Sequence, residues 1–317
     1  MNRGTVRTFP ALLLTAGLIA SLTSCAGSTF AGQACDSPVT TGDASSIVSA
    51  SSAFGDKPTV EFPTPLVTKK LQRSVLIPGD GAPLQPGQTA LIKYSVLDGA
   101  SGTVLQAGDY SSAATLITVG GSAIAAVSKG LQCATVGSRV AIVSAPKDSG
   151  QTAGAGGGAN DSFVWVIDIE RSFPATANGT PQIPQAHMPA VVTAPNGAPG
   201  ITVPKEPAPP KLAVNVLEQG HGHELAAGDQ VVLKYTAYLW DDSSVFDSTW
   251  TKGDAKVVAL KSSDTVTAGF VDGLVGKTVG SQVLIVVPPK DGFGDKGSTG
   301  VPAGATLIYV VDVLGVI

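Results

Sequence analysis

Apolar and polar residues alternate in short runs along most of this chain. Residues 89–96 read TALIKYSV and residues 230–239 read QVVLKYTAYL, both rich in Val, Ile, Leu and Tyr. A period of two over such runs predicts β-strands. Helical spacing is found only near 123–131 and 268–275. The pattern predicts an α+β fold in which an antiparallel sheet curls around one short helix.

The same blocks occur twice, in the same order. KGLQCATVGSRVAIV at 129–143 matches DGLVGKTVGSQVLIV at 272–286, and a Pro-Lys-Asp segment follows each. The spacing between equivalent positions is 141 from Tyr94 to Tyr235 and 144 from Asp168 to Asp312. A near-constant spacing indicates an internal repeat. We therefore predict two copies of one domain, in residues 59–173 and 211–317.

The copies are separated by a proline-rich stretch. Residues 174–210 contain ten prolines. Proline fixes φ and lacks a backbone donor, so this stretch cannot be a helix or an inner strand. We expect an extended connector.

Residues 1–24 have the features of an export signal. Arg3 and Arg7 precede a largely apolar run at 9–22, which at 14 residues is shorter than the ~20 needed to span a bilayer as a helix. We expect this segment to be removed from the mature protein.

The apolar run ends in Leu22-Thr23-Ser24-Cys25, which resembles the lipobox of bacterial lipoproteins. The resemblance implies that Cys25 is lipidated and that 25–58 is a tether. It also implies that the protein is lipid-anchored at the extracytoplasmic face of the cell membrane. The alternative is an ordinary signal peptide with an incidental cysteine.

Two further cysteines, Cys35 and Cys133, remain in the mature chain. In an exported protein, paired thiols oxidise to disulfides. The chain-entropy model assigns a loop of this length roughly 4–5 kcal/mol of stabilisation. We predict a Cys35–Cys133 disulfide; the alternative is two unrelated buried thiols.

The composition and the positions of the histidines argue against a nucleic-acid partner and a bound metal. Charged residues make up 14% of the chain, against roughly 25% in typical soluble domains, and the net charge is −4 with no dense Lys/Arg run. A nucleic-acid partner is therefore not expected. His187, His221 and His223 have no Cys or acidic cluster at metal spacing, and we expect no metal or other cofactor.

The second copy resembles the FKBP-type peptidyl-prolyl cis-trans isomerases. The resemblance rests on the blocks VVLKYTAYL, VFDSTW, TVTAGFVDGLVGKTVGSQV, VPPKDGFGDKG and VPAGATLIYVVDVL, which follow the family's order and spacing. It implies catalysed rotation of X-Pro bonds, whose barrier is ~18–20 kcal/mol. A twisted amide has lost its resonance and tolerates a dry apolar site better than the planar amide does, so no nucleophile is required.

The resemblance also implies the binding pocket. Phe270 takes the floor, where many members have tryptophan, and Asp247 is the acid at the rim, with Lys252 where an arginine often pairs with it. Phe293 replaces a tyrosine whose hydroxyl bonds the substrate, and Thr267 replaces an isoleucine. The full predicted set is Tyr235, Phe246, Asp247, Val266, Thr267, Phe270, Phe293 and Tyr309.

The first copy departs from this pattern. It keeps Tyr94 and has Trp165 at the last-strand aromatic position, but Leu105-Gln106 replaces Phe-Asp. Val127 stands at the floor and Ser149 near the place of Phe293, and residues 154–158 form a glycine-rich loop. We predict an inactive scaffold or interaction domain.

The resemblance therefore implies an isomerase acting on proline-containing exported polypeptides through its C-terminal copy, with FK506-type ligands as further binding partners. The alternative is a non-catalytic peptide-binding or chaperone lipoprotein that uses both FKBP-like clefts.

Overall fold

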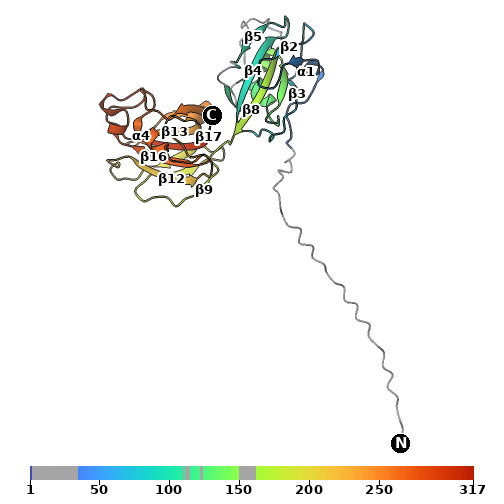
Figure 1. Ribbon diagram of the computed structural model, residues 1–317. Coiled ribbons are helices and arrows are strands. Elements are labelled where there is room, and N and C mark those ends of the chain that lie inside the picture. The colour runs from blue at the N-terminus through green and yellow to red at the C-terminus, as the bar shows by residue number, and fades with distance from the viewer. Residues whose placement is uncertain (2–34, 109, 111–114, 122–123, 150–161) are drawn as a thin grey trace. The chain divides into compact units, whose positions relative to one another are not determined.

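A computed structural model describes residues 1, 35–108, 110, 115–121, 124–149 and 162–317 (Figure 1). The predicted export signal, Cys25 and the glycine-rich loop at 154–158 lie outside these residues. Within the described ranges, no helix has the length and apolar character needed to cross a membrane.

The first repeat forms an antiparallel sheet with the strand order β3-β7-β8-β4-β5, and β6 also pairs with β4. Its long central strands are the alternating runs of the sequence. The strands are β3 (Gln72–Ile77), β4 (Thr89–Asp98), β5 (Val104–Ala107), β6 (Thr115–Thr118), β7 (Arg139–Ser144) and β8 (Phe163–Phe173).

The second repeat forms a sheet of the same topology, with the order β14-β13-β17-β16-β12 and β15 paired with β13. Even the register shifts recur: β4 is irregular against β8 at Leu91/Ile92, and β13 against β17 at Val232/Leu233. The strands are β12 (Ala213–Gln219), β13 (Gln230–Leu239), β14 (Val245–Ser248), β15 (Lys256–Ala259), β16 (Gln282–Val287) and β17 (Leu307–Val316).

Both predicted helices are present, as α2 (Ala125–Gly130) and α4 (Ala268–Leu274). Each packs closely on its sheet at a glycine. A Cβ on Gly130 would lie 2.5 Å from Ile142, and one on Gly273 would lie 2.8 Å from Ile285. The close approach encloses an apolar core between helix and sheet in each repeat.

The expectation of one helix per copy was too simple for the second copy, which also contains α3 (Thr249–Lys252); another short helix, α1 (Asp43–Ser46), precedes the first copy. Each has four residues, about one turn, which is too short to produce an apolar period. The first turn of α3 is capped by the Ser248 hydroxyl, which accepts from the Trp250 N–H at 3.2 Å. Short 3₁₀ turns follow at η1 (Pro146–Asp148), η2 (Pro289–Asp291) and η3 (Gly294–Lys296).

The predicted tether at 25–58 is wrong for residues 35–58, which are folded. Strand β1 (Ser49–Ser51) pairs with β2 (Thr59–Glu61), and the α1 segment packs Ala44 and Val48 on the outer face of the first sheet. The Gln72 side chain accepts from the N–H groups of Ala44 and Ser45. Such contacts come from distant parts of the chain and leave no local pattern.

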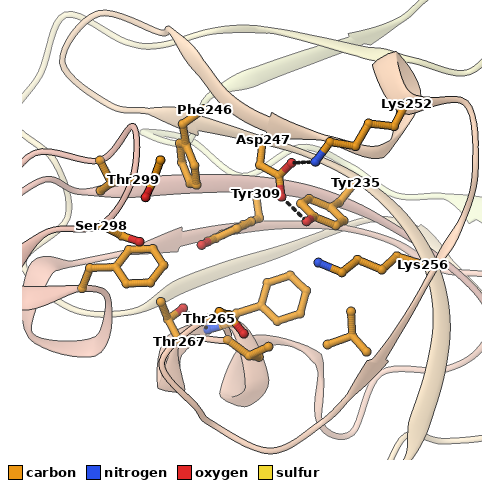
Figure 2. A pocket seen from close by; sticks show the side chains of 15 residues that line it. Tyr235, Phe246, Asp247, Lys252, Lys256, Thr265, Thr267, Ser298, Thr299 and Tyr309 are labelled. Atoms are coloured by element: carbon orange, nitrogen blue, oxygen red, sulfur yellow. Dashed lines mark hydrogen bonds and ion pairs between the residues drawn. The ribbon is translucent and has the colours of Figure 1, made fainter.

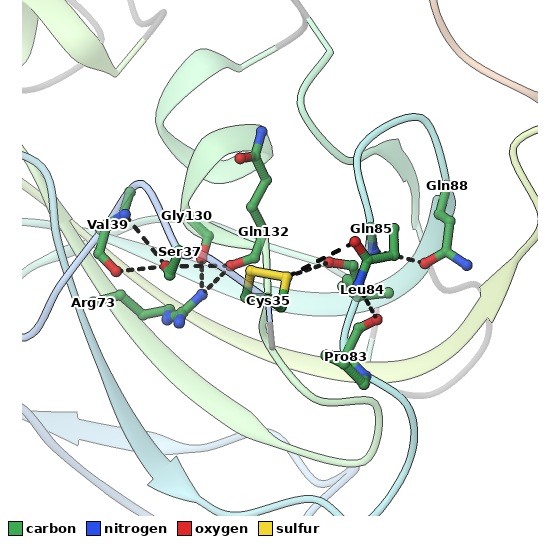
Figure 3. Close-up of a disulfide and its surroundings, with 11 residues drawn as sticks. Cys35, Ser37, Val39, Arg73, Pro83, Leu84, Gln85, Gln88, Gly130 and Gln132 are labelled. Carbon is green, nitrogen blue, oxygen red and sulfur yellow. Dashed lines mark hydrogen bonds between the residues drawn. A yellow bond between two sulfur atoms is a disulfide. The ribbon is translucent and has the colours of Figure 1, made fainter. Parts of the chain in front are cut away.

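Cys35 and Cys133 form a disulfide with Cα atoms 5.5 Å apart (Figure 3). Nearby, the guanidinium of Arg73 donates to the Gly130 and Gln132 carbonyls, at 2.8 and 2.6 Å. A cation at a helix C-terminus satisfies carbonyls that lack helical partners. The bridge ties Cys35 of the folded N-terminal segment to the chain just after α2, and Arg73 ties β3 to the same place.

The connector at 174–210 is not a free extended linker. Strand β9 (Thr180–Pro181) adds to the edge of the second sheet at β12, and β10 (Ala190–Thr193) forms a hairpin with β11 (Pro199–Thr202). The side chains of Met188, Val191 and Ile201 pack against an apolar cluster on the outer face of that sheet. As expected for proline, Pro181 lies at a sheet edge. Residues 174–210 therefore form a packed arm.

Candidate active site

A cavity of about 320 Å³ opens in the second repeat. Strands β13, β14 and β17, helix α4 and the loop after η2 all contribute side chains. All eight residues predicted from the sequence line it: Tyr235, Phe246, Asp247, Val266, Thr267, Phe270, Phe293 and Tyr309.

A chain of polar contacts crosses the rim. The Tyr235 hydroxyl donates to Oδ2 of Asp247, and Lys252 Nζ lies 2.7 Å from Oδ1 (Figure 2). Partial burial acts to raise the pKa of Asp247, but the hydrogen bonds from Lys252 and Tyr235 outweigh it and place that pKa below its ordinary value. The site therefore holds an ionised carboxylate in a fixed position at neutral pH.

Strand pairing sets this position. Asp247 lies in β14 opposite Ala237 of β13, so its side chain follows the pleat of the sheet rather than forming a turn. The Thr249 hydroxyl accepts from the Tyr235 N–H at 2.9 Å, which ties the start of α3 to the same strand. Lys252 is the last residue of that short helix.

Four of the five aromatic rings that line the cavity pack against one another. The rings of Phe270 and Tyr309 are 5.0 Å apart with an interplanar angle of 69°, and those of Phe246 and Tyr309 are 6.0 Å apart at 82°. Tyr235 completes the group, 6.3 Å from Phe270. Edge-to-face pairs of this kind are favourable and hold the rings in place.

The aromatic side chains at the floor of the cavity are buried. Tyr235, Phe270 and Tyr309 are each less than 8% exposed. Burial raises the pKa of Tyr309 to about 12, and burial together with the Asp247 hydrogen bond raises that of Tyr235. Both phenols are therefore neutral hydrogen-bonding groups at physiological pH.

Thr267 and Phe293 are the two departures from the expected residue types. The Thr267 hydroxyl accepts from the Phe270 N–H at 3.3 Å and caps α4, which accounts for a polar residue at this buried position. Phe293 precedes η3 and presents a ring without a hydroxyl.

Comparison with known proteins places this cavity within a family. Residues 222–314, which contain all eight predicted residues, match the model of the FKBP-type peptidyl-prolyl cis-trans isomerases. The chain is 29% identical over 116 residues to the probable FK506-binding protein of Corynebacterium glutamicum, a match that covers 37% of this chain and 96% of that protein. It is 33% identical over 102 residues to FK506-binding protein 2 of Emericella nidulans, covering 31% of this chain and 75% of that protein.

The chain belongs to the FKBP-type peptidyl-prolyl cis-trans isomerase family. It is accordingly a peptidyl-prolyl isomerase. Among solved structures, FkpA from Escherichia coli matches with 29% identity and a TM-score of 0.31, over 40% of this chain and about half (51%) of that chain.

Other residues that line this cavity are not among those predicted from the sequence. Lys256 and Val258 are two positions apart in β15, so they share a face, and the period of that strand could have indicated them. Thr265 is a neighbour of the predicted Val266. Ser298, Thr299 and Val301 lie in a turn, closed by mutual backbone hydrogen bonds of Ser298 and Val301, and carry no local signal.

The first repeat keeps Tyr94 but differs at the positions of Asp247, Phe270, Phe293 and Tyr309. Gln106 Nε2 donates to the Tyr94 hydroxyl at 2.8 Å, so an amide stands where the second repeat has Asp247. Trp165, at the position of Tyr309, is 1% exposed and lies 6.0 Å from the Tyr94 ring. Val127 is buried where Phe270 forms the floor, and the buried Ser149 hydroxyl donates to the Pro146 carbonyl.

Within the part of the chain that the structure describes, no group of three or more His, Cys, Asp and Glu side chains could hold a metal ion.

Proposed function

We propose that the repeats are two FKBP-like domains and that only the cavity of the second, at residues 211–317, catalyses X-Pro rotation. The supporting observation is the ionised Asp247, held by Tyr235 and Lys252 beside the aromatic rings. At the matched place the first repeat has an uncharged amide and a buried indole.

The cavity suits this reaction because rotation breaks no bond. The proline ring would pack on Phe270, Phe246 and Tyr309, and the X-Pro amide would lie in a water-poor space. Loss of amide resonance on twisting makes the carbonyl and nitrogen less dependent on hydration, so the dry rings favour the transition state over the planar ground state. The fixed carboxylate and the neutral phenols supply polar groups that need no reorganisation.

A matched pair of variants tests this assignment in the full-length protein. Asp247→Leu removes the rim carboxylate, and we expect kcat/KM on a proline tetrapeptide to fall about ten-fold or more, as for loss of one charged hydrogen-bonding group. Gln106→Leu alters the equivalent position of the first repeat and should leave activity unchanged. FK506, as a ligand of the same cavity, should inhibit the wild type. Equal losses in both variants would contradict the assignment.

We further propose that Cys25 carries lipid and that the protein acts outside the cytoplasmic membrane on exported polypeptides. The lipobox-like segment at 22–25 and the Cys35–Cys133 disulfide support this, because disulfides persist in oxidising compartments. Uncatalysed X-Pro isomerisation takes tens of seconds, which gives such an enzyme a use during folding.

Fractionation of cells tests the anchor. Cys25→Ala removes the residue that would carry the acyl chains, and stable anchoring needs more than one such chain. The variant should therefore move from the membrane fraction to the soluble fraction or remain unprocessed. A variant that remains lipid-labelled and membrane-bound would overturn this proposal without touching the isomerase assignment.

A further inference from the structure

The charges around the isomerase cavity do not balance. Its lining contains two lysines, Lys252 and Lys256, and one carboxylate, Asp247. Both oxygens of that carboxylate are already engaged, one by the Tyr235 hydroxyl and the other by Lys252. The positive charge of Lys256 therefore has no partner of its own in the lining.

Lys256 is placed to act on a bound peptide. It pairs with Leu233 across the sheet and shares a face with Val258, whose side chain also lines the cavity. Figure 2 shows the ammonium end of Lys256 turned toward the aromatic rings of the pocket, on the other side of Tyr235 from Lys252. The side chain is exposed, so the ammonium keeps its hydration until a ligand approaches.

No described residue neutralises Lys256. None of the ion pairs formed within the described ranges includes it. Its charge is nevertheless felt in the cavity, because Lys256 is one of the groups that lower the pKa of Asp247. A cation that acts on Asp247 through space will also act on a carboxylate carried by the peptide in the cavity.

We propose that Lys256 is a specificity-determining residue that selects X-Pro sequences in which X is Asp or Glu. This inference rests on the proposed function of the cavity. Residue X is bonded to the proline, its Cα only 3.8 Å from the next in a trans peptide, so its side chain must lie at the rim when the proline ring is on the aromatic floor. A carboxylate on residue X would then lie near Lys256, whose charge is not balanced by a carboxylate of its own in the lining.

The competing interpretation is that Lys256 only covers Val258 with its aliphatic stem while its ammonium is solvated, as exposed lysines commonly do. The two interpretations differ in one measurable quantity. Only a charge-selective Lys256 makes the enzyme prefer Glu over the isosteric but neutral Gln at X.

The experiment measures kcat/KM of the full-length protein on tetrapeptides that differ only at X, with X as Glu, Gln, Leu or Lys, in a protease-free isomerisation assay. A rim ion pair corresponds to a preference for Glu over Gln of about three- to five-fold at low salt. The preference should approach one at ~0.5 M salt, where charges are screened within about 4 Å. The Lys peptide should be the poorest.

Variants then assign the preference to one residue. Lys256→Gln should bring the Glu-to-Gln ratio close to one, and Lys256→Glu should bring it below one and improve the Lys peptide. Lys211→Gln, which changes an exposed lysine outside the cavity lining, is the matched control and should keep both ratio and activity.

The outcomes distinguish the role of Lys256 from the function of the cavity. Catalysis of the Leu and Gln peptides with no preference for Glu would overturn the role of Lys256 and leave the isomerase cavity standing. An equal loss of preference in Lys211→Gln would also overturn it, since the effect would then come from net charge. Absence of catalysis on all four peptides would remove the proposed function itself.

Discussion

The two repeats share strand order, register shifts and the helix glycine that lies against the sheet, and both keep one buried aspartate, yet the polar partner of that aspartate differs. On the outer face of the first sheet, Arg139 and Asp168 form a fully buried ion pair, 2.6 Å apart. The equivalent residues of the second are Gln282 and Asp312, joined by a hydrogen bond of 2.8 Å. The topology therefore does not depend on which of these polar pairs is present.

Each buried carboxylate also holds the segment that precedes its repeat. Asp168 accepts from the Gly55 N–H at 2.8 Å, and Asp312 accepts from the Ala177 N–H at 3.0 Å. Arg139 also donates to the carbonyls of Ser52, Ala53 and Asp56. The attachment of the segment that precedes the first repeat therefore depends far more on charged side chains than the attachment in the second repeat does. The inner faces differ as well: the second repeat presents an open cavity lined by aromatic rings, and the first has the buried Trp165 at the position of Tyr309.

The largest effect is expected from breaking the ion pair of the first repeat. Asp168→Asn leaves the buried Arg139 without a counter-charge, which typically costs about 3–5 kcal/mol. Urea unfolding and hydrogen exchange of β7 and β8 should both report the loss. Lys93→Gln is the control, because Lys93 and Glu170 form a partly exposed pair of the kind that contributes at most about 1 kcal/mol. A cost for Asp168→Asn no larger than for this control would show that the pair is dispensable.

A second effect, about ten-fold in kcat/KM, is expected from giving the cavity of the second repeat the floor residue of the first. Phe270→Val introduces the residue type found at Val127 and removes a ring that lies 5.0 Å from Tyr309 and 6.3 Å from Tyr235. The proline ring then loses its stacking surface, while the fold tolerates the smaller residue at a cost of roughly 1–3 kcal/mol. Circular dichroism checks the fold and the tetrapeptide assay the activity.

Val127→Ala is the matched change in the first repeat. It should lower stability without lowering kcat/KM. If it reduced catalysis as much as Phe270→Val does, the assignment of activity to one repeat would be wrong.

The sequence alone predicted those elements and cavity residues that have a local pattern or lie in a repeated block. Period-two runs predicted the central strands, and the offset between copies predicted two sheets that do share one topology. The cavity residues that follow a strand or helix face, such as Tyr235 and Phe270, could be placed because the blocks fix their order along the chain.

The rest depends on contacts between distant segments. Helix α1 is one turn held by Gln72, and the apolar residues of the packed arm are scattered between prolines without a period. Ser298 and Thr299 reach the cavity only because the loop after η3 turns back toward β14. These contacts join residues that are far apart in the chain, so a short stretch of sequence does not reveal them.

The outer face of the second repeat should respond to pH through Asp312. Burial raises the pKa of Asp312 above its ordinary value of 3.8. Between the two pKa values the carboxyl is ionised in the unfolded state and still protonated in the folded state. The stability that the protonated Asp312 contributes is therefore fully present below pH 3.8 and is lost as the pH rises through the higher pKa of the folded state. Asp312→Asn removes this dependence, and the Gln282 amide can rotate to accept from the new amide group.

We expect Asp312→Asn to be as stable as the wild type near pH 4 and up to about 1 kcal/mol more stable at pH 7. Urea unfolding between these pH values measures the difference, with the exposed Asp264→Asn as control. A loss at pH 7 as large as that of Asp168→Asn would mean that the two buried carboxylates are equivalent after all.

The smallest effect concerns Phe293, the cavity ring that lacks a hydroxyl. Phe293→Tyr adds a donor at the rim of the second repeat, where the X-Pro carbonyl would rotate. One neutral hydrogen bond contributes about 1 kcal/mol, which corresponds to a several-fold rise in kcat/KM. Ser149→Tyr is not a usable counterpart, because Ser149 is buried; Phe293→Leu serves instead and should lower activity, since it removes the ring and adds no donor. The two changes together separate the contribution of the ring from that of the hydroxyl. If Phe293→Tyr and Phe293→Leu changed kcat/KM equally, the ring at this position would not contact the substrate, and the rotating carbonyl would have to be bound elsewhere along the rim.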